Sequence, residues 1–369
     1  MVGIGPSVVP GESLFVGSGC APRLPPIDRA LIPSAGPATR RISLTAQPLT
    51  QQDLDWFGGQ FESIVGNIER VIQGKRSVVE LVVTSLLAGG HILVEDVPGV
   101  GKTLLAKALA RSIDCQFQRI QFTPDLLPSD VTGVSVWDRE RGGFVFRSGP
   151  IFANVVLGDE INRASPKTQS ALLEAMEERQ VTVDGTTRPL GNPFMVIATQ
   201  NPIEHEGTYP LPEAQLDRFM VRVVMGYPSR DKELEILETH GRRPSYPDLR
   251  PVVSADHVVK MAHLATQIHV ADAIKEYIVD TVSATRHDPD LLLGASPRAA
   301  LYLLRVARTL AIVAGRHYAI PDDVKAALRP VLTHRLIMQP EAQMRGVTLE
   351  EIVDGVAGAV AVPGSGVRV

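Results

Sequence analysis

Cysteine is scarce in this chain, which has two cysteines among 369 residues. Cys20 and Cys115 form no CxxC pair and no disulfide framework, which is typical of proteins in a reducing cytosol. The sequence also lacks any run of about 18 uninterrupted apolar residues, so it offers no transmembrane helix. Its first residues lack both the charged start and the continuous apolar stretch of a secretory signal. We therefore predict a cytoplasmic protein with no transmembrane segment.

An excess of charge of either sign is lacking as well. Lys and Arg number 37 against 41 Asp and Glu, and the net charge is −4. This balance gives no support for a surface that binds nucleic acid or an anionic membrane. The nine histidines form no HExxH motif or other tight set of metal ligands. What remains is an ordinary globular composition, in a chain long enough for two or three domains.

What the sequence does contain is an alternation of apolar runs and helical patterns between about residues 91 and 225. Several runs are continuously apolar, as in strands buried on both faces, and strands that alternate with helices predict a parallel sheet. Two stretches, 133–149 and 179–190, have the pattern of inserted β-hairpins. The five predicted strands of the sheet are 91–95, 117–122, 154–159, 194–199 and 219–225.

The segments that flank this region differ from it in composition. The first 45 residues are rich in Gly, Pro and Ser without periodicity, which predicts a disordered tail. From about residue 229 onward the pattern is helical. We predict a tail at 1–45, an α/β domain at 46–227, a helical lid domain at 228–345 and a C-terminal tail at 346–369.

The stretch VEDVPGVGKTLLAKALA, from Val94 to Ala110, ends like a phosphate-binding loop. Gly101, Lys102 and Thr103 fit the end of the P-loop pattern, in which backbone N–H groups and the lysine hold phosphates and the threonine hydroxyl binds Mg²⁺. Asp96 stands where the first glycine belongs. We expect its carboxylate to brace the turn and to point away from the phosphates. The alternative is a plain strand–turn–helix with a surface lysine. The predicted nucleotide contacts here are Asp96, Val97, Pro98, Gly99, Val100, Gly101, Lys102, Thr103 and Leu104.

Two further polar groups follow buried strands. Asp159 and Glu160 end the apolar run VVLGDE like a Walker B motif, in which the first acid holds Mg²⁺ and the second polarises the attacking water. Asn201 ends the next run, where a polar side chain can orient that water and touch the γ-phosphate. The alternatives are a solvated acidic strand end and a turn residue before proline.

Two arginines complete the set of candidates. Arg218 in LPEAQLDRF is either a structural ion-pair partner of Asp217 or Glu213, or an arginine finger offered to a neighbouring subunit. Arg298 in GASPRAALYLL is either a surface arginine or a cation that reaches back from the helical domain to the γ-phosphate. The helix dipole disfavours a cation at a helix start, which favours the functional interpretation.

Five segments together resemble the MoxR family of AAA+ ATPases: EDVPGVGKT, DEINRASPKTQSALLEAMEE, ATQNP, EGTYPLPEAQLDRF and SPRA. The resemblance covers about residues 50 to 345. It implies an AAA+ P-loop module with a C-terminal helical lid, and assembly into a ring that is usually a hexamer. It also implies the two inserted hairpins, which magnesium-chelatase and MCM-type relatives share.

The resemblance assigns roles to residues at matching positions. It implies ATP and Mg²⁺ as cofactors, with Thr103 and Asp159 at the metal. It implies that Arg218 is the arginine finger acting in trans, and that Asn201 and Arg298 are sensors 1 and 2. The implied catalytic set is Glu160, Asn201, Arg218 and Arg298, and the adenine contacts fall near Ile72 and Gly74.

The resemblance also implies a chaperone-like ATPase that acts on a client or adaptor protein, often one with a von Willebrand factor A domain. One alternative is a nucleic-acid motor related to MCM-type helicases, which needs cations at the hairpin tips. Here the tips mix acids with arginines, which argues against that motor. Another alternative is a nucleotide-gated scaffold without turnover, and the intact Asp159-Glu160 pair argues against it.

Overall fold

The computed structural model describes residues 49–97, 99–201, 208–227, 230–240 and 249–364. The predicted disordered tail at 1–45 lies outside these ranges. Among the helices of the described part, none combines the length and the apolar character needed to cross a membrane.

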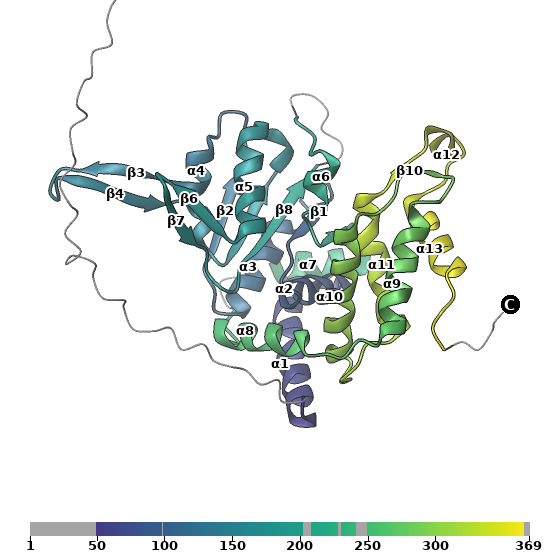
Figure 1. The fold of residues 1–369 in the computed structure, drawn as a ribbon. Coiled ribbons are helices and arrows are strands. Elements are labelled where there is room, and N and C mark those ends of the chain that lie inside the picture. Colours follow the sequence, from purple (N-terminus) through teal and green to yellow (C-terminus); the bar gives the residue numbers. More distant parts are fainter. Residues whose placement is uncertain (1–48, 98, 202–207, 228–229, 241–248, 365–369) are drawn as a thin grey trace, which may run out of the picture. The chain divides into compact units, whose positions relative to one another are not determined.

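A parallel sheet of five strands forms the centre of the α/β part, as the sequence predicts (Figure 1). Neighbouring strands are parallel throughout, and their order is β2-β5-β8-β1-β9. The order places β8 between β5 and β1, so the carboxyl ends of these three strands lie side by side. The strands are β1 Ile92–Glu95, β2 Phe117–Gln121, β5 Val155–Asp159, β8 Met195–Gln200 and β9 Val221–Val223.

Both faces of the sheet are buried, because successive side chains of a strand point to opposite faces. Val94 and Leu157 belong to one apolar cluster, whereas Leu93 and Val156 belong to another. The first cluster includes α1 Gln51–Glu69, α2 Arg76–Leu87 and α3 Lys102–Ser112. The second includes α4 Pro128–Thr132 and α5 Pro166–Glu178.

Two antiparallel hairpins are inserted in this unit, which confirms the prediction from alternation (Figure 1). Asp184 and Gly185 have φ angles of 52° and 70°, as a two-residue hairpin turn of type I′ requires. The hairpins contact each other, because the Arg188 guanidinium lies 3.9 Å from the centre of the Phe146 ring. The hairpins are β3 Gly133–Asp138 with β4 Gly143–Ser148, and β6 Gln180–Val183 with β7 Thr186–Pro189.

The C-terminal half forms the predicted helical lid, with buried residues such as Leu303 and Val306 along its longest helix. Its helices are α7 Arg230–His240, α8 Ala255–Thr266, α9 Asp272–Thr285, α10 Pro297–Val313, α11 Pro321–Leu332 and α12 Pro340–Met344. A small sheet pairs β10 Leu291–Leu293 with β11 Ile337–Met338.

Short helical turns occur at Pro150–Phe152, Ile161–Arg163 and Thr333–Arg335, and a four-residue helix, α6, at Glu213–Leu216.

The structure differs from the predicted organisation at the C-terminus. Within the stretch 346–369, which the sequence analysis assigns to a tail, Leu349–Ala359 forms helix α13. Thr348 and Glu351 form a capping box at its start, which satisfies backbone N–H groups of the first turn. Val353 is buried in the same apolar cluster as the lid helices. The part of this stretch that forms α13 therefore belongs to the lid, and the prediction of a tail is wrong there.

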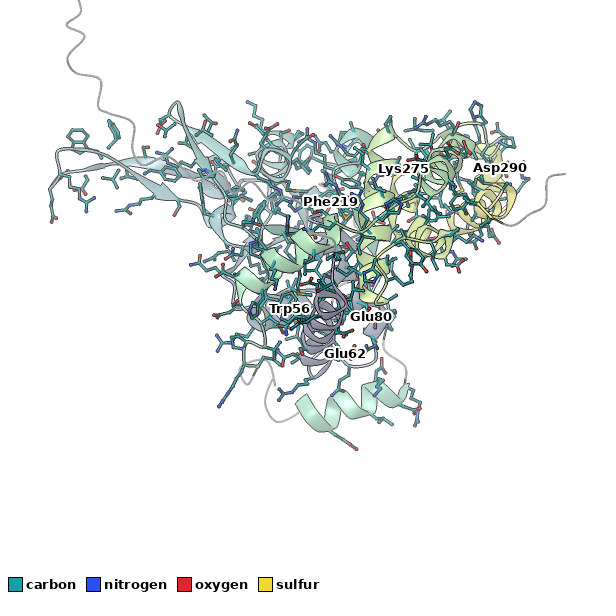
Figure 2. All side chains as sticks on the ribbon, turned by 60° about the horizontal axis from the view of Figure 1, so that its bottom comes forward. Trp56, Glu62, Glu80, Phe219, Lys275 and Asp290 are labelled. Carbon is teal, nitrogen blue, oxygen red and sulfur yellow. The ribbon has the colours of Figure 1, made fainter. Side chains whose placement is uncertain are left out.

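Polar contacts connect α1 with α2 and with α8. Arg76 of α2 forms ion pairs with Glu62 of α1, at 2.6 Å, and with Glu80, at 2.7 Å, and both acids are labelled in Figure 2. The Lys260 ammonium of α8 lies 4.2 Å from the centre of the Trp56 ring. Exposed ion pairs stabilise a fold by only about 0–1 kcal/mol each, so we regard them as orienting contacts on a framework held by apolar packing.

Candidate active site

The loop between β1 and α3 has the geometry of an anion cradle. Gly99 and Gly101 have φ angles of 86° and 97°, in the left-handed region that glycine adopts without strain. Gly101 is the residue before α3, so Lys102 and Thr103 stand in the first turn of that helix. The Lys102 ammonium donates to the Asp96 carbonyl oxygen at 2.8 Å. Pro98, another predicted contact, lies outside the described residues.

Asp96 is buried, with 7% of its surface exposed. One carboxylate oxygen accepts from the Val97 N–H at 2.8 Å, and the other accepts from the Gly226 N–H at 2.6 Å. Both oxygens are therefore engaged with backbone donors, one in the loop and one in the segment after β9. The side chain ties the start of the P-loop to the neighbouring strand, which accounts for an acid at a position where the pattern has glycine.

Asp159 and Glu160 follow β5 and share a partner. The Thr199 hydroxyl donates to Asp159 Oδ1 at 2.7 Å and accepts from the Glu160 N–H at 2.9 Å. The Arg119 guanidinium donates to Asp159 Oδ2, with an ion-pair distance of 2.5 Å. Asp159 is only 9% exposed, so the arginine offsets the cost of burying its charge. Thr199 fixes the relative placement of the two acids.

Glu160 has a φ angle of 58°, which is uncommon for a residue with a side chain and typical of functional turns. Its Oε2 atom accepts from Gln121 Nε2 at 2.7 Å and from the Arg163 guanidinium at 3.1 Å. The carboxylate is thus held by β2 on one side and by the turn after β5 on the other. It lies at the carboxyl edge of the sheet, as the sequence predicts for a residue that follows a strand.

A magnesium ion is compatible with the oxygen groups at this edge. Asp159 offers a carboxylate and Thr103 a hydroxyl, and Mg²⁺ prefers such oxygens together with substrate phosphates and water. Among the described residues, no group of three or more His, Cys, Asp or Glu could hold a metal by itself.

Asn201 directly follows β8 and is 7% exposed. In the sheet register Gln200 pairs with Glu95, and the Gln200 carbonyl accepts from the Asp96 N–H at 3.4 Å. Because β8 lies between β1 and β5, Asn201 stands between the P-loop and the acids that follow β5. The structure therefore brings these three predicted elements to one edge of the sheet.

The predicted adenine contacts lie beside the P-loop. A Cβ atom added to Gly101 would stand 3.9 Å from Ile72 Cδ1, so the Ile72 side chain covers the end of the loop. Gly74 has a φ angle of 70°, and the following Lys75 donates to the Tyr227 carbonyl at 2.9 Å. The turn after α1 and the segment after β9 therefore meet next to the P-loop.

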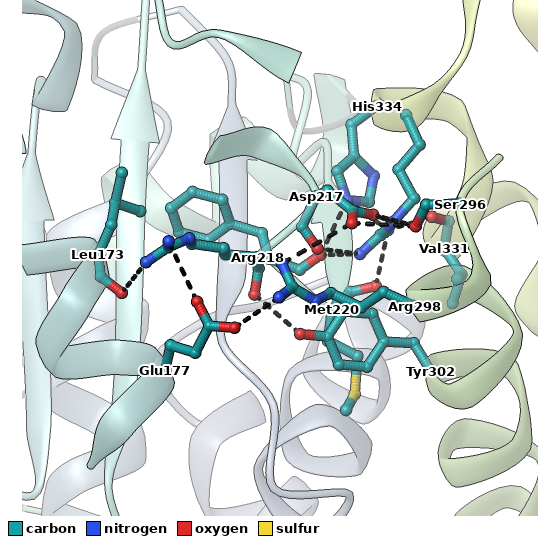
Figure 3. Close-up of polar contacts among 12 residues, drawn as sticks. Leu173, Glu177, Asp217, Arg218, Met220, Ser296, Arg298, Tyr302, Val331 and His334 are labelled. Carbon is teal, nitrogen blue, oxygen red and sulfur yellow. Dashed lines mark hydrogen bonds and ion pairs between the residues drawn. The ribbon is translucent and has the colours of Figure 1, made fainter. Parts of the chain in front are cut away.

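Arg218 lies at the opposite edge of the sheet, before β9. The nearby Met220 N–H donates to the carbonyl of His91, the residue that precedes β1. The Arg218 guanidinium donates to the Leu173 carbonyl at 2.8 Å and forms a 3.1 Å ion pair with Glu177 (Figure 3). Glu177 belongs to the last turn of α5.

Arg298 stands beside Arg218 and shares its partner. Its guanidinium lies 2.5 Å from the other carboxylate oxygen of Glu177, and 3.7 Å from Asp217 (Figure 3). The four residues of β1 separate this edge from the P-loop, and at about 3.3 Å per residue they span roughly 13 Å. The structure thus places Arg298 beside Arg218, the predicted arginine finger. Both lie across the sheet from the P-loop of their own subunit. The sequence, in contrast, suggests that Arg298 reaches the γ-phosphate directly.

A pocket of about 270 Å³ lies at this edge, between the start of β1 and helix α10. Its lining carries one carboxylate, that of Glu177, against four guanidinium groups. His91 in the same lining adds no charge at neutral pH, because burial lowers its pKa to about 4. The pocket is strongly cationic and suits a multiply charged anion such as a phosphate. The four arginines are Arg179, Arg218, Arg298 and Arg305.

Several residues at the carboxyl edge and around the paired arginines were not predicted from the sequence. Arg119 and Gln121 are two apart on β2 and so share a face, and Gln121 pairs with Asp159 in the register. Polar residues two apart in a predicted strand, next to a strand that ends in acids, indicate side chains that contact those acids. Thr199 stands two residues before Asn201 in its strand, which is the same pattern. Glu177 gives no such signal, because its role depends on how the lid docks.

Two parts of the chain match known families. Residues 91–221 match the ATPase family associated with various cellular activities (AAA). Residues 283–356 match the AAA lid domain. The two matches coincide with the sheet-centred unit and the helical lid.

The chain is also similar to individual proteins along most of its length. YeaC of Bacillus subtilis (strain 168) is 51% identical over 313 residues, which cover 85% of this chain and 97% of that protein. The protein named chaperone MoxR1 of Mycobacterium tuberculosis is 43% identical over 311 residues, which cover 82% of each chain. A crystal structure of a presumed ATPase from Cytophaga hutchinsonii is 38% identical and superposes with a TM-score of 0.80, covering 85% of this chain and 97% of the other.

Proposed function

This chain belongs to the MoxR family of AAA+ ATPases, and on that premise we propose that it hydrolyses ATP in a ring of identical subunits, with Mg²⁺, to remodel a partner protein. The observation that carries the proposal is the division of charged groups between the two edges of one sheet. The P-loop and the acids lie at the carboxyl edge, and the paired arginines lie at the other.

The carboxyl edge would bind the nucleotide. The backbone N–H groups of Gly99, Val100 and Gly101, together with the start of α3, would face the phosphates. Lys102 would leave the Asp96 carbonyl to reach the β- and γ-phosphates. Thr103 and Asp159 would hold Mg²⁺, which neutralises phosphate charge when it is bound. Ile72 and Gly74 would contact the adenine, with Leu104 behind the loop.

Glu160 would polarise the attacking water, and Asn201 would orient it toward the γ-phosphate. In the structure Gln121 and Arg163 both donate to Oε2 of the Glu160 carboxylate. These two donors hold the carboxylate at the carboxyl edge of the sheet, where the attacking water would stand.

The opposite edge would complete the site of a neighbouring copy. Arg218 and Arg298 share one carboxylate, in a cationic pocket that lies across the sheet from their own P-loop. Placing the two halves of a site on opposite edges makes a head-to-tail interface, and repeated copies of such an interface form a ring when the rotation between subunits closes. We propose a ring, in keeping with the hexamer that the family resemblance implies, with both arginines acting in trans.

A protein partner is supported by the first hairpin. Trp137 and Phe144 are 53% and 73% exposed, and their rings meet edge to face with centroids 5.3 Å apart. Exposed aromatic side chains are typical of surfaces that bind proteins. We propose that the client or adaptor, which the resemblance suggests has a von Willebrand factor A domain, meets this hairpin.

The hairpins give less support to a nucleic-acid motor. The Arg188 guanidinium lies over the Phe146 ring and donates to the carbonyls of Val183 and Thr186, at 3.2 and 3.1 Å, so it is engaged within the hairpins. At the other tip, Asp138 lies 3.7 Å from Arg141, which compensates that charge. A protein binds the phosphate backbone of a nucleic acid through exposed cations, and these two arginines are engaged with the hairpin or paired with an acid.

Phosphate release measured against protein concentration tests the proposal. The rate per subunit should rise over the range in which sedimentation shows assembly, because each site is completed by a neighbour, and a chelator should abolish it. Lys102→Ala, which removes the phosphate-binding lysine, is the inactive control. A rate per subunit that is independent of assembly contradicts the trans arrangement. ATP binding without phosphate release indicates a nucleotide-gated scaffold, and stimulation by DNA that is lost at higher salt indicates a nucleic-acid motor.

A further inference from the structure

The segment that carries Arg218 is attached to the lid through its backbone. Arg335, which follows α11, donates to the Asp217 carbonyl at 3.0 Å and to the Met220 carbonyl at 3.3 Å. The same guanidinium also donates to the Phe219 carbonyl. One side chain of the lid thus holds three of four successive carbonyls around the predicted finger.

The fourth carbonyl, that of Arg218 itself, is held by the lid as well. It accepts from the Tyr302 hydroxyl of α10 at 3.1 Å (Figure 3). His334 adds a second contact to Phe219, with its Nε2 atom 3.0 Å from that carbonyl oxygen. The start of a strand normally finds its partners in the sheet. Here every carbonyl from Asp217 to Met220 has a partner in the lid.

The side chains reinforce this attachment. Arg335 is 2% exposed at its side chain and forms a 2.8 Å ion pair with Asp217. Ser296, directly before α10, donates to the same carboxylate at 2.9 Å. Burying an ion pair stabilises a fold little or not at all compared with apolar packing. A buried guanidinium with this many carbonyl partners is therefore better explained by the placement of a segment than by stability.

We propose that Arg335 is the positioning residue of the arginine finger. It fixes the Asp217–Met220 segment to the lid of its own subunit, with Tyr302 as a second anchor, so that Arg218 is presented to the neighbour in the orientation that the lid dictates. This inference rests on the proposed trans role of Arg218, and the experiment below separates the two.

The first test is Arg335→Lys. Lysine keeps the charge but cannot reproduce a planar fork that donates to several carbonyls. We expect turnover to fall about 10²-fold, as for a displacement of a reacting group by about 1 Å, with ATP affinity and KM unchanged. Tyr302→Phe removes one hydroxyl without changing the shape and should lower turnover only a few-fold. Arg329→Lys is the matched control, because Arg329 lies on α11 and pairs with exposed Asp354, and its turnover should stay at the wild-type value.

The second test mixes subunits. Arg335→Lys subunits have an intact nucleotide site and a misplaced finger, whereas Glu160→Gln subunits have an inactive site and a well-placed finger. In a randomly mixed ring of equal parts, about a quarter of all sites pair an intact site with a good finger, because the interface is head-to-tail. The mixture should therefore reach about a quarter of wild-type turnover, far above either variant alone. Tyr302→Phe gives a second form of the test that does not need Arg335→Lys to fold. For a defect of about three-fold, its mixture with Glu160→Gln should reach about a third of wild-type turnover if the defect acts on the neighbour, and about a sixth if it acts on its own site.

A parallel mixture of Arg218→Ala with Glu160→Gln separates the two proposals. If this mixture recovers turnover and the Arg335→Lys mixture does not, Arg335 acts on its own site or on folding, and the positioning role is overturned. If the Arg218→Ala mixture also fails, the trans finger itself is rejected. Recovery in both mixtures supports both proposals.

Discussion

The two edges of the central sheet differ in what holds their functional groups. At the carboxyl edge, Asp96, Asp159 and Glu160 are fixed by partners from the sheet-centred unit itself. At the opposite edge, the backbone around Arg218 is held by residues of the lid, whereas its guanidinium contacts α5. Arg298 is carried on a lid helix. A change in how the lid docks would therefore act first on the arginine edge. Under the proposed function, one subunit binds ATP at the edge that its sheet-centred unit holds, and it activates its neighbour with the edge that its lid helps to position.

Removing Arg218 should give the largest difference between the two edges, because it should lower turnover without changing ATP binding. Arg218→Ala should lower turnover by about 10³- to 10⁵-fold, because a trans arginine stabilises the charge of the transition state, while ATP binding persists. Phosphate release and equilibrium ATP binding measure the two effects. Arg345→Ala, which removes a lid arginine paired with Asp290, is the control. Undiminished turnover in Arg218→Ala would reject the finger.

The catalytic acid should come next. Glu160→Gln keeps the shape of the side chain but removes the charge that polarises water, so turnover should fall by about 10²- to 10⁴-fold. ATP should still bind, since the P-loop is unchanged. Single-turnover measurements with bound ATP separate the rate of hydrolysis from ATP binding. Glu62→Gln, at an exposed acid of α1, should behave like the wild type. Wild-type turnover in Glu160→Gln is incompatible with the assigned base.

Arg298 tests whether residues of the arginine edge act on the neighbouring subunit or on their own. Arg298→Ala should lower turnover by about 10²- to 10³-fold, as for loss of one donor to a developing charge. Mixing with Glu160→Gln subunits should restore part of the turnover if Arg298 serves the neighbour. A defect that mixing leaves unchanged would place Arg298 at the site of its own subunit, as the sequence suggests.

The smallest functional effect is expected at Asp96. Its carboxylate is held by Val97 and Gly226, so Asp96→Gly should leave ATP affinity and turnover within a few-fold of the wild type. The free energy of unfolding should fall by about 1.5–3 kcal/mol, the range for a hydrogen bond to a charged group. Calorimetric ATP titration and chemical denaturation measure the two. A large loss of ATP affinity would show that the carboxylate takes part in phosphate binding.

Much of the carboxyl edge could be predicted from the sequence, because its elements follow buried strands in a fixed order. Asp159 and Asn201 end apolar runs, and parallel strands bring their carboxyl ends to one edge. The glycines of the P-loop are needed where the backbone adopts positive φ. The five strands follow from their apolar runs, the first hairpin from alternation and the second from its Asp184-Gly185 turn, as the structure confirms.

The opposite edge could be predicted only in part. Arg218 and Arg298 stand out by motif, but their shared partner Glu177 depends on how α10 docks against α5. No local pattern encodes the distance between residues 121 positions apart. Arg335 has the same problem, since it lies more than 110 residues from the carbonyls that it holds. Helix α13 is different, because its capping box and apolar spacing were available in the sequence.

His91 carries a consequence for the behaviour of the protein in acid. Its Nδ1 atom accepts from the Val196 N–H at 2.9 Å, so the proton of the neutral ring resides on Nε2, which donates to the Met176 carbonyl at 3.0 Å. Burial lowers the pKa of this ring from 6.5 to about 4. The unfolded chain therefore takes up a proton near pH 6.5 that the folded chain does not accept until about pH 4. Across that interval each step toward lower pH shifts the equilibrium toward unfolding, so the burial of His91 lowers the stability of the folded chain as the pH falls from about 6.5 toward 4.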